Sequence, residues 1–342
     1  MIIVELVRDA VTSPTNRNNP ITLEIKVLTT LRYLVTVKMQ LCIADELGIS
    51  QSSVSRISHQ TINALSRPHI LRQFIRFPLD VRQLQRNKAH FMAIAGLPGV
   101  VGAIDGTHVQ IIAPSQDEHA FVNRKKNHSI NTQVVFDTSY NIFDICAKWP
   151  GATHDSRILQ ESGLRQLFER HHVPAGCHLV GDSGYPCRTW LLTPYIHPQS
   201  GPQFNYNRAH KKTRSVVERG IGQMKCRFHV LHGDMWLTPK KASRITTVCA
   251  ILHNLCQQCN IPQPEEYEDD DYDVAATDDD EGGVAVHVLR KMLMEQDHHK
   301  LLQDCQEQGL GRRGQEPGGQ EEGGQEGGGQ EHCHYWQQNC WP

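Results

Sequence analysis

The chain has 342 residues and a formal net charge of −2, and its 11 cysteines show no framework spacing, which fits the reduced thiols of the cytosol or nucleus. That length allows one large domain or two ordinary ones, and no run of about 18 apolar residues predicts a membrane span. The first residues, MIIVELVRDAV, have neither a basic start nor a long apolar run, which argues against a secretory signal.

Residues 1–70 predict an all-α region. Pro20 marks a helix start, and apolar residues recur at helical spacing from Leu23 to Val35. In CIADELGISQSSVSRISHQTINAL, Gly48 supplies a turn between two short helices and Ser50 caps the second helix. This is a helix-turn-helix pattern, although plain helical hairpins share it. The polar residues expected to contact DNA are Gln51, Ser52, Ser53, Ser55 and Arg56.

Residues 71–98 are expected to connect this region to a second domain at 99–260. VVGAID, HVQII, INTQVVFD and FDICAKW predict closely spaced strands, because they are short and rich in β-branched residues. DSRILQESGLRQLFERHH predicts a helix, CHLVGD another strand, and TRSVVERGIGQMKCRF and PKKASRITTVCAILHNLC two further helices. This order predicts an α/β fold with a ribonuclease H-like mixed sheet flanked by helices.

Positive charge is concentrated between Gln203 and Arg244, which span ten Lys and Arg but two acidic residues. More widely, residues 1–261 carry 30 Lys and Arg against 17 Asp and Glu, a net charge of +13. Such a surface suits DNA, since Lys and Arg replace the counterions on phosphate, although a generically soluble basic surface would look the same. The expected DNA contacts in this stretch are Asn205, Arg208, Lys211, Lys212, Arg214 and Lys225.

A tail of opposite charge occupies residues 261–342. From residue 262 onward it carries 5 Lys and Arg against 20 Asp and Glu, and it includes EEYEDDDYDVAATDDDEGG and the repeat GGQEEGGQEGGGQE. Such segments repel themselves and have too few apolar residues to build a core, so the tail is predicted to be disordered. It could compete with DNA for the basic surface or only keep the protein soluble.

Three acidic residues are candidates for a metal-dependent active site. Asp105 ends VVGAID, where Gly106 and Thr107 are expected to let the chain turn, Asp182 ends CHLVGD, and Glu218 lies within a long amphipathic helix. Two-metal phosphoryl chemistry needs carboxylates from different elements, because Mg²⁺ prefers oxygen ligands and keeps positions open for phosphate and water. A carboxylate at the end of an apolar strand also calls for a compensating cation, although each residue alone could serve as a turn, cap or ion-pair residue.

Asp155, in PGATHDSRIL, is a fourth candidate. It stands at the predicted start of a helix, where a carboxylate can accept backbone N–H bonds and complement the helix dipole. The preceding turn could instead bring it to the same edge of the sheet as the other acids. Direct metal coordination and a capping or supporting role both stay open.

Five motifs, in this order along the chain, resemble those of PIF/Harbinger-type transposases and their domesticated nuclease relatives: IDGTHV, WPGATHDSRIL, LVGDSGYP, FNYNRAHKKTRSVVERGIGQMKCRF and ILHNLC. The resemblance implies a DDE nuclease domain with Asp105, Asp182 and Glu218 as the metal triad and Asp155 at a further acidic position. It also implies a divalent cation, Mg²⁺ or alternatively Mn²⁺, a Myb-like DNA-binding partner protein, and a location in the nucleus and also the cytoplasm. Ile221 stands where the family often has an aromatic residue, which we expect to be a change in packing.

Two hypotheses of function follow. In the first, the protein is a metal-dependent endonuclease in which Asp105 and Asp182 bridge two Mg²⁺ ions and Glu218 completes the second ion's shell. In the second, it is a domesticated DNA-binding or scaffold protein that keeps the fold without turnover. The sequence indicates neither the DNA target nor an oligomeric state.

Overall fold

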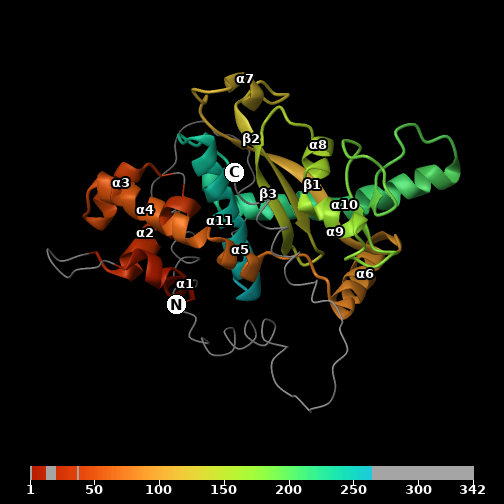
Figure 1. Cartoon of the computed structure of the whole chain (residues 1–342), viewed down its shortest axis with the longest axis horizontal. Helices are drawn as coiled ribbons and strands as arrows, with labels where there is room; N and C mark the ends of the chain where they lie inside the picture. The colour runs from red at the N-terminus through yellow and green to blue at the C-terminus, as the bar shows by residue number, and fades with distance from the viewer. Residues whose placement is uncertain (1, 13–20, 37, 264–342) are drawn as a thin grey trace, which may run out of the picture.

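A five-stranded mixed sheet forms the centre of the computed structural model, which describes residues 2–12, 21–36 and 38–263 (Figure 1). The strands β1 (Val100–Gln110), β2 (Ser129–Phe136) and β3 (Ile142–Pro150) are antiparallel neighbours. β4 (His178–Val180) and β5 (Leu191–Leu192) extend the sheet in parallel from β1, which gives the order β3-β2-β1-β4-β5. The predicted α/β fold, with a ribonuclease H-like mixed sheet flanked by helices, is confirmed.

β1 is one continuous strand, and this corrects the expectation that VVGAID and HVQII are separate strands joined by a turn. Gly106 and Thr107 stay in the strand, with Gly106 directly opposite Gln133 of β2. Because successive side chains of a strand point to opposite faces, Asp105 and Gly106 lie on different sides of the sheet. Asp105 is therefore a mid-strand residue, and the glycine that follows it serves a purpose other than turning the chain.

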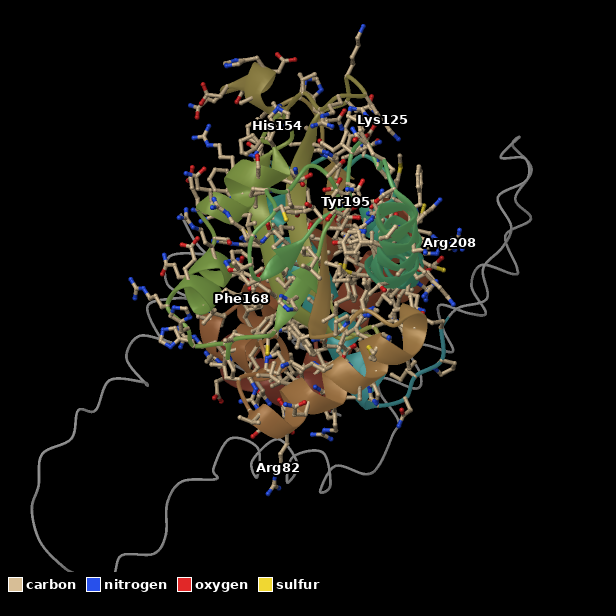
Figure 2. The ribbon with its side chains drawn as sticks, turned by 90° about the vertical axis from the view of Figure 1, so that its right-hand side faces the viewer. Arg82, Lys125, His154, Phe168, Tyr195 and Arg208 are labelled. Carbon is tan, nitrogen blue, oxygen red and sulfur yellow. The ribbon has the colours of Figure 1, made fainter. Side chains whose placement is uncertain are left out.

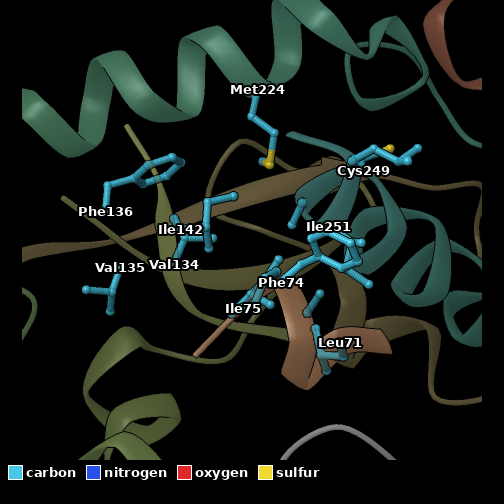
Figure 3. Packing of buried hydrophobic residues seen from close by; sticks show 14 of the residues in the cluster. Leu71, Phe74, Ile75, Val134, Val135, Phe136, Ile142, Met224, Cys249 and Ile251 are labelled. Atoms are coloured by element: carbon cyan, nitrogen blue, oxygen red, sulfur yellow. The ribbon is translucent and has the colours of Figure 1, made fainter. Parts of the chain in front are cut away.

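Two long helices cover one face of the sheet. α10 (Gly201–Arg227) and α11 (Pro239–Gln258) lie on the face that carries Phe136, whose ring contacts Gly220 of α10 and meets His253 of α11 edge-on at 5.9 Å between ring centroids. Figure 3 shows Met224 of α10 and Ile251 of α11 in the same apolar core. This core fixes the long helix α10 against the sheet.

The segment predicted as a single helix after β3 forms two short helices, α8 (Asp155–Gln160) and α9 (Gly163–Glu169). The first helix ends at Gln160, and Ser162 caps the second, since its hydroxyl accepts a hydrogen bond from the backbone N–H of Arg165. The predicted connector also contains regular structure, because α5 (Pro68–Phe74) and α6 (Val81–Ala95) lie in or next to it. A four-residue helix, α7 (Glu118–Phe121), and a 3₁₀ turn, η1 (His229–Leu231), complete the domain.

The N-terminal region contains two helices joined by a turn at Gly48, where the sequence predicts one. After α1 (Ile2–Val11) and α2 (Leu23–Val35), the helices α3 (Gln40–Leu47) and α4 (Gln51–Leu65) are joined through Gly48, whose φ of +63° is left-handed. Ser50 caps α4 by accepting from the backbone N–H of Ser53. The start predicted at Pro20 lies outside the described residues, and Thr22 caps α2 instead.

One buried asparagine joins three elements of the two regions. Asn254 of α11 accepts from the backbone N–H of Ile142 through Oδ1, and its Nδ2 donates to the backbone carbonyls of Ile142 and Phe74, all at 2.8 Å. A second link joins α11 to α4, where Arg244 Nη1 donates to Asn63 Oδ1 at 2.6 Å. The helix-turn-helix region is thus attached to the same helix that covers the sheet.

The acidic tail predicted at residues 261–342 lies outside the described residues from 264 onward. Within the described ranges, no helix has the length and apolar character that crossing a membrane requires.

Candidate active site

The strand register places Asp105 and Asp182 side by side. β1 and β4 run parallel with Ala103 opposite Val180, and each aspartate follows two residues later along its chain. Neighbouring strands are about 4.8 Å apart, so two residues at equivalent positions beyond a pairing lie close together. Gly184 closes the turn after β4 by donating its backbone N–H to Asp182 Oδ1 at 2.9 Å.

Asp155, the first residue of α8, lies close to Gly106 of β1 and to the turn that follows β4. Its Oδ1 accepts from Asn131 Nδ2 at 2.9 Å and would lie 2.5 Å from a Cβ at Gly106, so this carboxylate occupies the space that a side chain there would need. A Cβ at Gly184 would lie 3.1 Å from Asp182 Oδ1 and 3.7 Å from Asp155 Oδ2. Those two oxygens are therefore at most 6.8 Å apart, the sum of the two distances. Gly106 makes room for a carboxylate.

Glu218 is linked to this group through Arg214, four residues earlier on α10. Arg214 Nη1 donates to Asp105 Oδ2 at 2.8 Å, and its Nη2 donates to Glu218 Oε1 at 2.5 Å. The Glu218 side chain is half exposed, whereas that of Asp105 is 16% exposed. Arg214, which the sequence suggested as a DNA contact, thus bridges two candidate metal ligands.

Burial is the largest influence on the electrostatics of Asp105. Burial raises the pKa of Asp105 from its ordinary value of 3.8 to about 6, and the nearby charges of Asp182 and Asp155 add to this, against the opposing effects of Arg214 and the Gly106 N–H. Carboxylates with perturbed pKa values tend to cluster at functional sites, which makes Asp105 a candidate for one.

A buried tyrosine stands beside the same carboxylates. Tyr185 is 4% exposed, and the described residues offer its hydroxyl no hydrogen-bond partner. Burial raises its pKa well above the ordinary value, and the charges of Asp155, Asp105 and Asp182 raise it further. Sequence reasoning missed Tyr185 and Asn131, although Tyr185 falls within the LVGDSGYP motif.

The donor set fits a hard divalent cation, because the four candidate ligands are all carboxylates. Their present geometry does not enclose an ion, and no other set of three His, Cys, Asp or Glu side chains does so in the part of the chain that the structure describes. Glu218 is paired with Arg214 instead. To join a cation held by the other acids, Glu218 would have to leave Arg214.

The predicted DNA contacts lie on two helices, α4 and α10, which stand apart from each other in Figure 1. On α4, four of the five are exposed, and Ser53 is half-buried with its Oγ 2.9 Å from Ser50 Oγ. On α10, Asn205, Arg208, Lys211 and Lys212 are exposed, and Figure 2 shows Arg208 at the outer side of the helix. Lys225 is half-buried and donates to the backbone carbonyl of His108 at 3.0 Å, and burial lowers its pKa.

Residues 104–254 match a family model described as "DDE superfamily endonuclease". The chain is 36% identical over 282 residues to a rat protein named "Putative nuclease HARBI1", a match that covers 78% of this chain and 80% of that protein. The human protein of the same name is 37% identical over 260 residues, with 74% and 72% covered. "Protein ALP1-like" of Arabidopsis thaliana is 30% identical over 256 residues, with 70% and 62% covered. No solved structure matches the chain.

Proposed function

The chain belongs to the DDE superfamily endonuclease family, together with the HARBI1 proteins, and from this premise we propose that it hydrolyses DNA phosphodiester bonds with a divalent cation. The observation that carries the proposal is the approach of three carboxylates to one another: Asp105 from β1, Asp155 from the start of α8 and Asp182 from the turn after β4. The family match also confirms the Harbinger-type resemblance of the sequence motifs.

Each carboxylate has a role that follows from its position. Asp105 and Asp182 are the proposed primary ligands, because adjacent parallel strands hold them at the same level. Asp155, which Asn131 fixes, supplies a further oxygen from the other side of β1. Glu218 completes the set after it leaves Arg214. When bound, the cation supplies the positive charge that polarises a phosphate and promotes attack by water, and we favour Mg²⁺ or Mn²⁺ because the ligands are oxygens.

We assign DNA contact to the exposed polar residues of α4 and to the exposed cations of α10, namely Arg208, Lys211 and Lys212. The helix-turn-helix geometry supports the first assignment, because Gly48 and Ser50 build the turn and cap expected of that motif. The excess of positive charge on α10 supports the second. A Myb-like partner protein and a nuclear and cytoplasmic location are further proposals, supported by the family relationship alone.

The test is cleavage of a labelled DNA duplex by the purified full chain with Mg²⁺ or Mn²⁺. We expect Asp105→Asn, Asp182→Asn and Glu218→Gln to lose about 10²- to 10³-fold in rate, since several kcal/mol of charge stabilisation disappear with a metal ligand. Glu161→Gln is the matched control, because Glu161 is an exposed acid at the end of α8 whose ion pair is with Arg157, four residues earlier. If every protein binds the duplex and none cuts it, the alternative of a DNA-binding or scaffold protein replaces the nuclease.

A further inference from the structure

The outward side of α10 carries a line of side chains that ends at Glu218. An α-helix has about 3.6 residues per turn, so positions three or four apart share a face. The members of this line are Phe204, Arg208, Lys211, Ser215 and Glu218, of which all but the half-buried Ser215 are exposed. The opposite side of the helix is buried, at His210, Thr213 and Val217 among others. The line therefore faces solvent along its length, and Figure 1 shows that the N-terminal half of α10 projects beyond the sheet.

The charge along α10 suits a chain of phosphates. Glu218 is its one acidic residue, whereas Arg208, Lys211 and Lys212 precede it and Arg219 follows it. A polyanion lying on this face would meet repulsion only at Glu218, which is the point where the proposed cation binds. The face is thus attractive to a nucleic acid strand on the N-terminal side of the catalytic carboxylate.

Phe204 stands at the far end of the line, and two exposed apolar side chains lie on the loop before the helix. Phe204 is 54% exposed, and Tyr195 and Ile196, on the loop before the helix, are 51% and 74% exposed. The loop is attached to α10 because Asn207 Oδ1 accepts from the backbone N–H of Tyr195 and Asn207 Nδ2 donates to the Tyr195 carbonyl, both at 2.9 Å. Exposed rings next to cations are the combination that binds the flat faces of unpaired bases.

We propose that α10 guides an unpaired DNA strand away from the scissile phosphate and that one of its bases stacks on Phe204. The inference rests on the proposed DNA substrate and deepens it. Phe204 precedes Glu218 by 14 residues, which is about 21 Å along the helix. A strand with B-form spacing of about 3.4 Å covers this with roughly six nucleotides, and a stretched strand needs fewer. The bases of a duplex stack on one another and leave no free face, so the Phe204 ring should favour single-stranded ends.

The test compares two probes by fluorescence anisotropy without divalent cations, so that no cleavage occurs. The probes are labelled oligo(dT) of about 20 nucleotides and a labelled duplex of the same length, which exceed the site size of a typical single-strand module. Phe204→Ala should weaken the affinity for oligo(dT) roughly 5- to 150-fold, the equivalent of one base–aromatic stack. The affinity of the Phe204→Ala variant for the duplex should stay within about twofold of that of the wild type, because paired bases offer no free face to the ring.

Two further variants make the outcome specific. Phe204→Trp keeps a ring and should retain wild-type affinity for oligo(dT), whereas Phe204→Leu keeps only apolar character and should not. Met92→Ala removes a comparably exposed apolar side chain from α6 and should change neither affinity.

Several results would overturn the proposal. One is equal weakening for both probes, a second is full rescue by leucine, and a third is an unchanged affinity for oligo(dT). In a fourth, Phe204→Ala dissociates an oligomer in sedimentation experiments but keeps its affinity for oligo(dT). That result would assign the exposed Phe204 ring to contact with a second copy of the chain. The measurement contains no cleavage step, so its result is separate from that of the nuclease assay. A protein that never cuts DNA can still show the stack, and an active nuclease can lack it.

Discussion

Replacing Asp105 by asparagine should stabilise the cation-free protein at neutral pH while removing the proposed activity. Burial raises the pKa of this carboxyl from 3.8 to about 6, so the folded state holds the proton more tightly than the unfolded chain does. Between these two values the unfolded chain binds fewer protons, and the free energy of unfolding therefore falls as the pH rises. A shift of roughly 2 units at about 1.36 kcal/mol per unit corresponds to about 3 kcal/mol of lost stability above pH 6.

Asparagine carries no charge and avoids this loss. The substitution also removes the ion pair between Asp105 and Arg214, so about 3 kcal/mol is the upper limit of the gain in the free energy of unfolding. For a domain of this size, that limit corresponds to a rise in Tm of about 6 to 12 °C. Thermal unfolding in EDTA between pH 4 and pH 7.5 would measure it, with Glu161→Gln as the control. The difference in Tm between Asp105→Asn and the wild type should be small at pH 4 and grow towards pH 7.

Added Mg²⁺ or Mn²⁺ should reverse the order. A ligand that binds only the folded state raises stability by mass action, and the wild type alone keeps the full set of ligands. A variant that is less stable than the wild type at pH 7 in EDTA would refute the reasoning, and so would a difference in Tm that does not change with pH.

Three further substitutions test how the fold supports the site. Asn254→Ala should lower the free energy of unfolding by more than about 3 kcal/mol in urea titrations, because it leaves the buried N–H and carbonyl of Ile142 without partners, and a loss under about 1 kcal/mol would contradict this. Gly106→Ala should reduce both Tm and Mn²⁺ affinity, measured by calorimetry, because its Cβ would lie 2.5 Å from Asp155 Oδ1, and unchanged Mn²⁺ affinity would count against a supporting role for Asp155. Tyr185→Phe should raise the free energy of unfolding by about 1 kcal/mol in EDTA, since it removes a buried hydroxyl without a partner, and a decrease would show that the hydroxyl has one.

Local signals in the sequence were sufficient where local chemistry determines the structure. Gly48 adopts the left-handed conformation expected between α3 and α4, and Ser50 caps α4 as expected. Gly106 shows the limit of such signals, because glycine is compatible both with a turn and with the close approach of another side chain. Only the position of Asp155, 49 residues further along the chain, decides between them.

The candidate site was predictable to a similar degree. An apolar run that ends in an acid indicated Asp105 and Asp182, because buried carboxylates are rare without a purpose. The register that places them side by side depends on the pairing of β1 with β4, which are far apart in the sequence. Asn131 carries no charge and lies far from the acids in the sequence, so nothing local marks it as their neighbour, whereas Tyr185 follows Asp182 by three residues within the LVGDSGYP motif. The bridging position of Arg214 likewise follows from packing of α10 on the sheet.

The two ion pairs of Arg214 have a thermodynamic consequence for ligand binding. A cation that bound Asp105 and Glu218 would free the Arg214 guanidinium on α10, and a DNA phosphate that engaged this guanidinium would free the two carboxylates. Each ligand thereby removes a competitor of the other, so the two should bind with positive cooperativity. By linkage, the factor by which DNA tightens the cation must equal the factor by which the cation tightens DNA. The protein should therefore bind the cation and DNA more weakly when each is offered alone than when both are present.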